Sequence, residues 1–392
     1  MKTRLLSISF LIVVFALAAV NAGNCLLSLQ PLVDQYVKHE QVENVSSAHE
    51  LIGKVEDTYN NAFVTKMAFV ELHGATRRAL FSNWYNTVLR LKNGYLTYRY
   101  FDGDVKPYAD EITKLCDYVE SRGEEFLYVS VPYKVSPLDG NKEVPKGFDE
   151  KGNVNQNNML KYLSKEKVPF YDLRKPLAID YPDWYSAFFR TDQHWKPETG
   201  FWAYGKMATF FKKRYAYDYD PMTANLDYYH VDKYRNWFLG SQGKKTGLVY
   251  SGGAEDFSLI YPLFKTKMEV DVPVHNEHRK GSFREVMFKD SNLVKDYYNV
   301  NTYATYIGGD YPLCIQKNPD ASNKKKILVL KDSFTIAMQP YLSFMFNEVD
   351  VIDLRHYHKS LKKYIDKTDP DIVMVLYTSS MMSYPRAFDF GL

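Results

Sequence analysis

The sequence has few cysteines and little net charge. Its three cysteines, Cys25, Cys116 and Cys314, allow at most one intramolecular disulfide, and no two lie at the spacing of zinc ligands. Fifty basic residues nearly balance 47 acidic ones, so the formal net charge is only +3, which argues against nucleic-acid binding through bulk positive charge. No phosphate-cradling or dinucleotide-binding glycine motif follows a strand-like run, and no repeats occur.

Long apolar runs are also scarce, and the one that exists lies at the N-terminus. Lys2 and Arg4 precede an apolar stretch from Leu5 to Val20, and Val20-Asn21-Ala22 places short residues where a signal peptidase reads. We therefore predict a signal peptide over residues 1–22, either cleaved or kept as an anchor. The protein is then exported, to the periplasm, the cell surface or the extracellular space.

Aromatic residues are abundant, at 16% of the chain, with 33 Tyr, 24 Phe and 5 Trp. Such rings are favoured both in cores and on surfaces that bind sugar or protein, so their number alone does not separate these uses. The hydrophobic share of 45% and charged share of 25% are ordinary for a globular protein.

Hydrophobic periodicity predicts an α/β fold. Residues 23–80 are polar and weakly helical, and we interpret them as a lead-in to a domain over 81–385. There, helical patterns at 108–121 and 155–165 alternate with short apolar runs, which predicts a mostly parallel sheet flanked by helices. The expected strands are 126–131, 169–173, 327–330, 349–354 and 372–377. A Tyr-rich stretch at about 215–310, with short runs at 247–250 and 257–260, predicts an antiparallel or irregular insertion over the sheet.

The first block that could carry chemistry is Arg190-Thr-Asp-Gln-His-Trp195, at the start of a well-signalled helix with Pro197 in its first turn. Residues two apart in an extended loop point the same way, so Asp192 could hydrogen-bond His194 and fix its tautomer. The structural alternative is a histidine that caps the helix or packs beside Trp195.

The second block begins at Lys326 with the apolar strand 327–330, followed by Lys331-Asp332-Ser333 and a helical run. A serine at this junction is displayed at the carboxyl edge of the sheet, where open α/β folds bind ligands, and its N–H can donate to an oxyanion. The simpler alternative is that Asp332 or Ser333 only caps the helix.

Together these blocks resemble the SGNH-hydrolase-like alginate O-acetyltransferases of the AlgX and AlgJ type, and more closely their DHHW relatives. Asp192-Gln193-His194-Trp195 matches the D-x-H-W block and Asp332-Ser333-Phe334 the G-D-S-like block. Further similarity lies at 93–96, 131–134, 238–247, 303–310 and 349–355, so the resemblance spans about residues 80–380. Two residues depart from the pattern: Gln193 replaces a His, and Lys331 replaces a Gly, which puts the tightness of the turn before Ser333 in question.

The resemblance implies a polysaccharide O-acetyltransferase with Ser333 as nucleophile, His194 as base and Asp192 as the residue that orients it. It implies an extracellular polysaccharide as acceptor, a membrane-bound O-acyltransferase partner as acetyl supplier, and no metal or organic cofactor. Water as acceptor would make the same residues an esterase. Two other functions remain as alternatives. One is a glycan-binding scaffold without catalysis, and the other is a metal phosphoesterase that uses Asp192 and His194 as ligands.

Four further residues are candidates for contact with sugar. Lys134 comes after Pro132, which ends a predicted strand. Tyr250 and Tyr306 lie in the Tyr-rich segment, and Trp195 adjoins His194. Core packing would explain the aromatic residues equally well. The pairs His356/His358 and His275/His278 lack carboxylates at matching spacing, so we expect them to be solvated.

Overall fold

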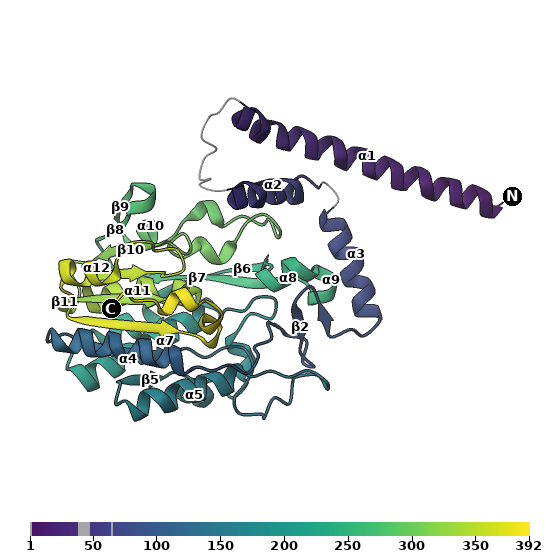
Figure 1. Cartoon of the computed structure of the whole chain (residues 1–392). Helices are drawn as coiled ribbons and strands as arrows, with labels where there is room; N and C mark the ends of the chain where they lie inside the picture. The colour runs from purple at the N-terminus through teal and green to yellow at the C-terminus, as the bar shows by residue number, and fades with distance from the viewer. Residues whose placement is uncertain (1, 38–47, 64–65) are drawn as a thin grey trace. The chain divides into compact units, whose positions relative to one another are not determined.

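The computed structural model describes residues 2–37, 48–63 and 66–392. It divides into two compact units, Met1–Leu80 and Phe81–Leu392 (Figure 1). The first unit contains only helices in its described part: α1 (Lys2–Val37), α2 (Ala48–Ala62) and α3 (Lys66–Ala79). Helix α1 is long and apolar enough to cross a membrane by length and composition, a test that a signal sequence also passes.

The second unit is built on an eight-stranded sheet in the order β5, β4, β13, β11, β12, β10, β8, β9. The first five strands are parallel, and β10, β8 and β9 continue the sheet in antiparallel pairs. The prediction of a mostly parallel sheet is confirmed. The strands are β4 (Glu125–Ser130), β5 (Phe170–Asp172), β8 (Met268–Val272), β9 (Glu277–Gly281), β10 (Leu313–Lys317), β11 (Asn323–Lys331), β12 (Phe346–Ile352) and β13 (Ile372–Tyr377).

Helices cover both faces of the parallel part, and its central strand β13 is buried at every position. In β13, Ile372, Met374 and Leu376 join one core cluster while Val373 and Val375 join the other. The first cluster includes side chains of α7 (Pro197–Tyr215) and α11 (Gln339–Met345), and the second includes side chains of α4 (Lys106–Ser121), α5 (Gly152–Lys165) and α12 (Leu361–Thr368). Burial of each large aliphatic side chain contributes about 1.5–3 kcal/mol.

The remaining strands and α-helices of the second unit lie outside the large sheet and the five helices named above. They are β1 (Trp84–Tyr85), β2 (Val88–Arg90), β3 (Leu96–Thr97), α6 (Arg174–Asp180), β6 (Tyr229–Phe238), α8 (Ser241–Thr246), α9 (Leu248–Ser251), β7 (Glu255–Pro262) and α10 (Phe283–Met287). Two 3-10 helices matter for the site, η6 (Thr302–Thr305) and η7 (Ser333–Ala337).

The Tyr-rich segment differs from expectation in two places. Strands β6 and β7 form a separate antiparallel pair, but β8 and β9 extend the large sheet rather than lying over it, because β10 offers them a free edge. The run 247–250, expected to be extended, belongs mostly to helix α9. Gly247 has φ +87 and turns the chain there between α8 and α9.

The parallel strands bring four chain segments to one edge of the sheet. Their carboxyl ends are followed by Val131–Lys134 after β4, Asp332–Ser333 after β11, Asp353–Arg355 after β12 and Thr378 after β13. Ligands of open α/β sheets bind at this edge.

Helix α7 approaches η7, the 3-10 turn that begins at Ser333, so closely that only glycine fits at the contact. A Cβ at Gly200 would lie 2.8 Å from the carbonyl oxygen and 2.9 Å from Cβ of Ala337, whereas one at Gly205 on the same helix would lie 3.7 Å from its nearest neighbours. We predict that Gly200→Ala lowers the free energy of unfolding in urea by about 1–3 kcal/mol through overpacking. The matched variant Gly205→Ala should raise it by up to about 1 kcal/mol through helix propensity. Equal effects of both changes would contradict this close contact.

Candidate active site

Asp192 and His194 lie in the loop that leads into α7. The loop is closed by an isolated antiparallel bridge between Phe188 and Trp195, and the Phe189 N–H donates to the His194 carbonyl at 3.1 Å. Trp195 then ties this loop to the serine turn, since its Nε1–H donates to the Phe334 carbonyl oxygen at 2.9 Å. Two segments 139 residues apart in sequence are thereby joined by a buried hydrogen bond.

Ser333 begins the 3-10 helix η7 directly after β11, and Asp332 caps it. One oxygen of Asp332 accepts from the Phe334 N–H at 3.0 Å, and the other accepts from the N–H and hydroxyl of Thr378, both at 2.7 Å. The capping role foreseen for Asp332 is therefore present and leaves the Ser333 hydroxyl available. Among the described residues, no acceptor is found for the Ser333 N–H.

The structure brings Ser333, His194 and Asp192 together. His194 Nε2 lies 2.7 Å from Ser333 Oγ, and its Nδ1 is hydrogen-bonded to Asp192 Oδ1. His194 and Ser333 are each 8% exposed and Asp192 is 3% exposed. A hydroxyl, an imidazole and a carboxylate in this order form a relay that can remove the hydroxyl proton and stabilise the resulting imidazolium.

Both oxygens of the Asp192 carboxylate accept hydrogen bonds. Oδ1 also accepts from the His194 N–H at 3.0 Å, and Oδ2 accepts from the Ser241 N–H at 2.6 Å. Although burial opposes ionisation, the charge of His194 and these hydrogen bonds hold the pKa of Asp192 well below its usual range.

Gly240 lets the segment before α8 approach Asp192 this closely. A Cβ on Gly240 would lie 2.1 Å from the Asp192 Cβ and 2.6 Å from its Oδ2. Residues 238–247 belong to the stretches that carry the family resemblance, but the sequence did not predict a role for this glycine. The residues next to Gly240 in sequence do not indicate that its backbone packs against Asp192, which lies 48 positions earlier.

Lys134 does not face the cleft, so the expectation that it contacts substrate is corrected. Its side chain is 1% exposed, and its ammonium donates to the carbonyl oxygens of Leu96 and Asp192 and, at 3.2 Å, to Gln242 Oε1. Burial lowers the pKa of Lys134 to about 7, opposed by the charges of Asp192 and Glu255. Lys134 therefore holds the loop that carries the Asp192 carboxylate.

The three aromatic candidates are also buried away from the cleft. Trp195, Tyr250 and Tyr306 are each 0% exposed. Trp195 bonds to Phe334 as described, the Tyr250 hydroxyl donates to the Ser82 carbonyl at 3.0 Å, and the Tyr306 hydroxyl bridges the two backbone groups of β7 at Ser258 and Ile260. The expectation that these rings contact sugar is corrected, because each has its polar atom bound inside the fold.

Two aromatic rings confine the His194 imidazole. Tyr303 of η6 stacks on it with ring centroids 4.4 Å apart and planes 13° from parallel, and Phe334 contacts it at 5.0 Å. The imidazole is thus held in the orientation that points Nε2 at Ser333. A stacked ring also interacts favourably with an imidazolium.

A cleft of about 470 Å³ opens over Ser333. Three basic side chains, Arg99, Lys245 and Arg355, line it, and no aspartate or glutamate is found among its lining residues in the described structure. The other lining residues are hydroxyl, aromatic or amide side chains: Thr87, Tyr98, Tyr100, Gln193, Ser241, Ser333, Ser380, Ser383 and Tyr384. Such a cleft is suited to a hydroxyl-rich ligand that carries negative charge.

Arg355 is fixed before any ligand binds. Its Nε and Nη2 donate to the two carboxylate oxygens of Asp353 at 2.9 and 2.5 Å, and Nη2 lies 3.4 Å from Asp310. Despite burial, Asp353 and Asp310 raise the pKa of Arg355, which keeps it charged. Its position just after a predicted strand was a usable signal that the sequence analysis did not take.

The two departures from the family pattern are accommodated. Lys331 ends β11 with an ordinary strand backbone, so no glycine is needed there, and its buried ammonium pairs with Asp310 and with Asp353 at 3.6 Å. Gln193 faces the cleft between Asp192 and His194 and takes no part in the relay. Among the described residues no group of three or more His, Cys, Asp or Glu could hold a metal ion.

Two protein-family models match parts of this chain. The model of the DHHW proteins matches residues 181–352, and that of the SGNH hydrolase-like domain of the acetyltransferase AlgX matches residues 92–226. No curated protein matches the chain.

Solved structures of the same fold include PatB1 of Bacillus cereus, with 21% identity, TM-score 0.64 and coverage of 77% of this chain and 99% of that one. A PatB1 structure with a sulfonyl adduct matches with TM-score 0.62, 21% identity and coverage of 77% and 97%. A DHHW family protein of Eubacterium siraeum matches with 17% identity, TM-score 0.59 and coverage of 78% and 94%. The resemblance to the SGNH-hydrolase-like AlgX acetyltransferase domain and the DHHW proteins, predicted from the sequence, is confirmed.

Proposed function

We propose that the protein is an exported polysaccharide O-acetyltransferase that works through an acetyl-serine intermediate. The observation that carries this proposal is the buried relay from Asp192 through His194 to Ser333 at the base of a hydroxyl-lined cleft. The match to an acetyltransferase domain and the apolar N-terminal helix support the acyl chemistry and the export.

In the first half-reaction Ser333 Oγ attacks the carbonyl carbon of an acetyl ester or thioester donor while His194 Nε2 takes the hydroxyl proton. The bond from that carbon to the donor's oxygen or sulfur breaks, and the leaving group receives the proton from His194. In this proposal the Ser333 N–H, at the start of η7, donates to the oxyanion of the tetrahedral intermediate.

In the second half-reaction a sugar hydroxyl attacks the acetyl carbon, His194 takes its proton, and the Ser333 oxygen leaves and is reprotonated. Acetyl-coenzyme A is not available outside the cell, so a membrane-bound O-acyltransferase partner supplies the donor in this proposal. The three cations of the cleft favour an acceptor that carries carboxylate or phosphate groups.

The first test is acylation of Ser333. We predict that the protein releases p-nitrophenol from p-nitrophenyl acetate, gains one acetyl group by intact-mass spectrometry, and is labelled at Ser333 by a sulfonyl fluoride through displacement of fluoride. Ser333→Ala should lower p-nitrophenol release by about a thousandfold or more and abolish both adducts. Ser186→Ala, a serine outside the cleft, is the matched control. Equal, negligible reactivity of the unchanged protein and Ser333→Ala would favour a glycan-binding scaffold instead.

A second test displaces Asp192 without altering the relay residues. The methyl group in Gly240→Ala would overlap the Asp192 side chain and shift it away from His194. We predict that the sulfonylation rate of Ser333 falls about a hundredfold, because small misplacements of a catalytic group have effects of this size. Gly205→Ala, whose added methyl has room, serves as the control, and circular dichroism confirms that each variant is folded. An unchanged rate in folded Gly240→Ala would show that Asp192 does not assist His194.

A third test concerns the charge of the acceptor. We predict that acetyl transfer from p-nitrophenyl acetate favours polygalacturonate over dextran, and that Arg355→Gln lowers kcat/KM for polygalacturonate by about tenfold or more through KM. A hydrogen bond to a charged group is typically worth about 1.5–3 kcal/mol. Lys213→Gln, on the last turn of α7, controls for the lost surface charge. Equal use of both polymers by the unchanged protein would contradict an anionic acceptor.

A further inference from the structure

A groove of about 510 Å³ lies on the face of the large sheet beside α12, separate from the catalytic cleft. Its floor contains the half-buried Leu313 and Ile315 of β10, and Tyr357 and Tyr364 lie along it. Helix α12 is only eight residues long and leaves this part of the sheet face open. Apolar and aromatic floors of this kind pack against the faces of sugar rings.

The groove carries an excess of positive charge. Five lysines line it against two carboxylates, those of Glu348 and Asp350, and both carboxylates are already paired with Lys326. Among the ion pairs of the described residues, none involves Lys359, Lys363 or Lys367. These three lysines are spaced four residues apart, so Lys363 and Lys367 lie on one face of α12 about 6 Å apart along its axis.

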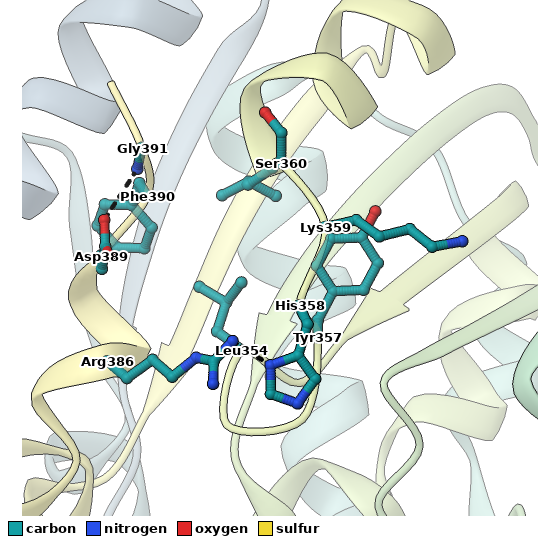
Figure 2. A pocket seen from close by; sticks show the side chains of 10 residues that line it. Leu354, Tyr357, His358, Lys359, Ser360, Arg386, Asp389, Phe390 and Gly391 are labelled. Atoms are coloured by element: carbon teal, nitrogen blue, oxygen red, sulfur yellow. Dashed lines mark hydrogen bonds between the residues drawn. The ribbon is translucent and has the colours of Figure 1, made fainter. Parts of the chain in front are cut away.

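The positive surface continues into a neighbouring pocket. A second pocket, of about 270 Å³, shares Tyr357, Lys359 and Ser360 with the groove and adds His358 and Arg386 (Figure 2). Figure 2 shows the Arg386 guanidinium directed at His358, to whose Nδ1 it donates, and neither side chain is paired with a carboxylate in the described structure. Among the described residues that line this pocket, Asp389 is the one acidic residue.

The second pocket and the catalytic cleft are built on the same two chain segments. Leu354 lines the pocket and Arg355 lines the cleft, and likewise Arg386 lines the pocket and Tyr384 lines the cleft. A polymer chain leaving the cleft over these segments would therefore meet the pocket first and the groove next.

We propose that the groove and the adjoining pocket bind a stretch of an anionic polysaccharide, the same acceptor chain that reaches Ser333. The tyrosine rings and lysine stems would pack on sugar rings while the ammonium and guanidinium groups meet carboxylates or phosphates along the chain. The identity of this ligand as the acceptor rests on the proposed function. Binding itself requires no acyl transfer, so the two fail independently.

The test is equilibrium binding of fluorescently labelled polygalacturonate, followed by anisotropy at low salt, with neutral dextran as the comparison polymer. We expect the protein to bind polygalacturonate and not dextran, and the double variant Lys363→Glu with Lys367→Glu to raise the dissociation constant about tenfold or more. The matched control reverses two exposed lysines elsewhere, Lys175→Glu with Lys213→Glu, which change the net charge equally. The control should shift binding by less than about twofold.

Three results would overturn the proposal: no binding of polygalacturonate, equal weakening in both double variants, or binding confined to vesicles of anionic phospholipid in a parallel sedimentation assay. Because sulfonylation of Ser333 is measured separately, an inert Ser333 with intact groove binding would reject only the acetyltransferase proposal. A labelled Ser333 without groove binding would reject only the inference made here.

Discussion

The buried carboxylate of Asp192 is the charge around which the candidate site is organised. A carboxylate removed from water is costly unless its oxygens receive hydrogen bonds, and Asp192 obtains them from the His194 imidazole, the His194 N–H and the Ser241 N–H. Two of these donors belong to the same loop, but the Ser241 N–H comes from a distant segment that must approach closely, which is why Gly240 carries no side chain. Lys134 holds the same loop through the Asp192 carbonyl oxygen. Loss of any one of these contacts leaves a buried charge under-satisfied.

Much of the fold could be predicted from the sequence because parallel strands covered on both faces form nearly continuous apolar runs. The runs 126–131 and 372–377 are examples that can be recognised without knowledge of their neighbours in the sheet. The site residues Asp192, His194 and Ser333 could also be predicted from the sequence, since each lies where a loop or strand meets a helix. The errors share one cause. Lys134, Tyr250 and Tyr306 were assigned to substrate because of their chemical type, but their partners lie 38 to 168 positions away in sequence, and no local pattern reports such contacts.

A network of buried ion pairs lies at the carboxyl edge of the sheet, beside the serine. Lys331, Asp310, Asp353 and Arg355 form a network in which each buried charge meets an opposite one, so Arg355 reaches the cleft already immobilised. Lys331 stands at the position of the glycine in the G-D-S pattern, and here it contributes a buried cation instead of backbone freedom. The turn before Ser333 is stabilised by this network and by the Asp332 cap rather than by a flexible residue.

The antiparallel extension of the sheet also bears on how copies of the protein behave beside one another. The outermost strand on that side, β9, is a run of charged residues and histidine, from Glu277 to Lys280, and the opposite outermost strand, β5, is only three residues long. Short or charged edge strands discourage pairing between sheets of different molecules. A sheet of eight strands with such ends resists adding strands from neighbouring molecules, so the edges that could start a fibril are blocked at both sides of the sheet.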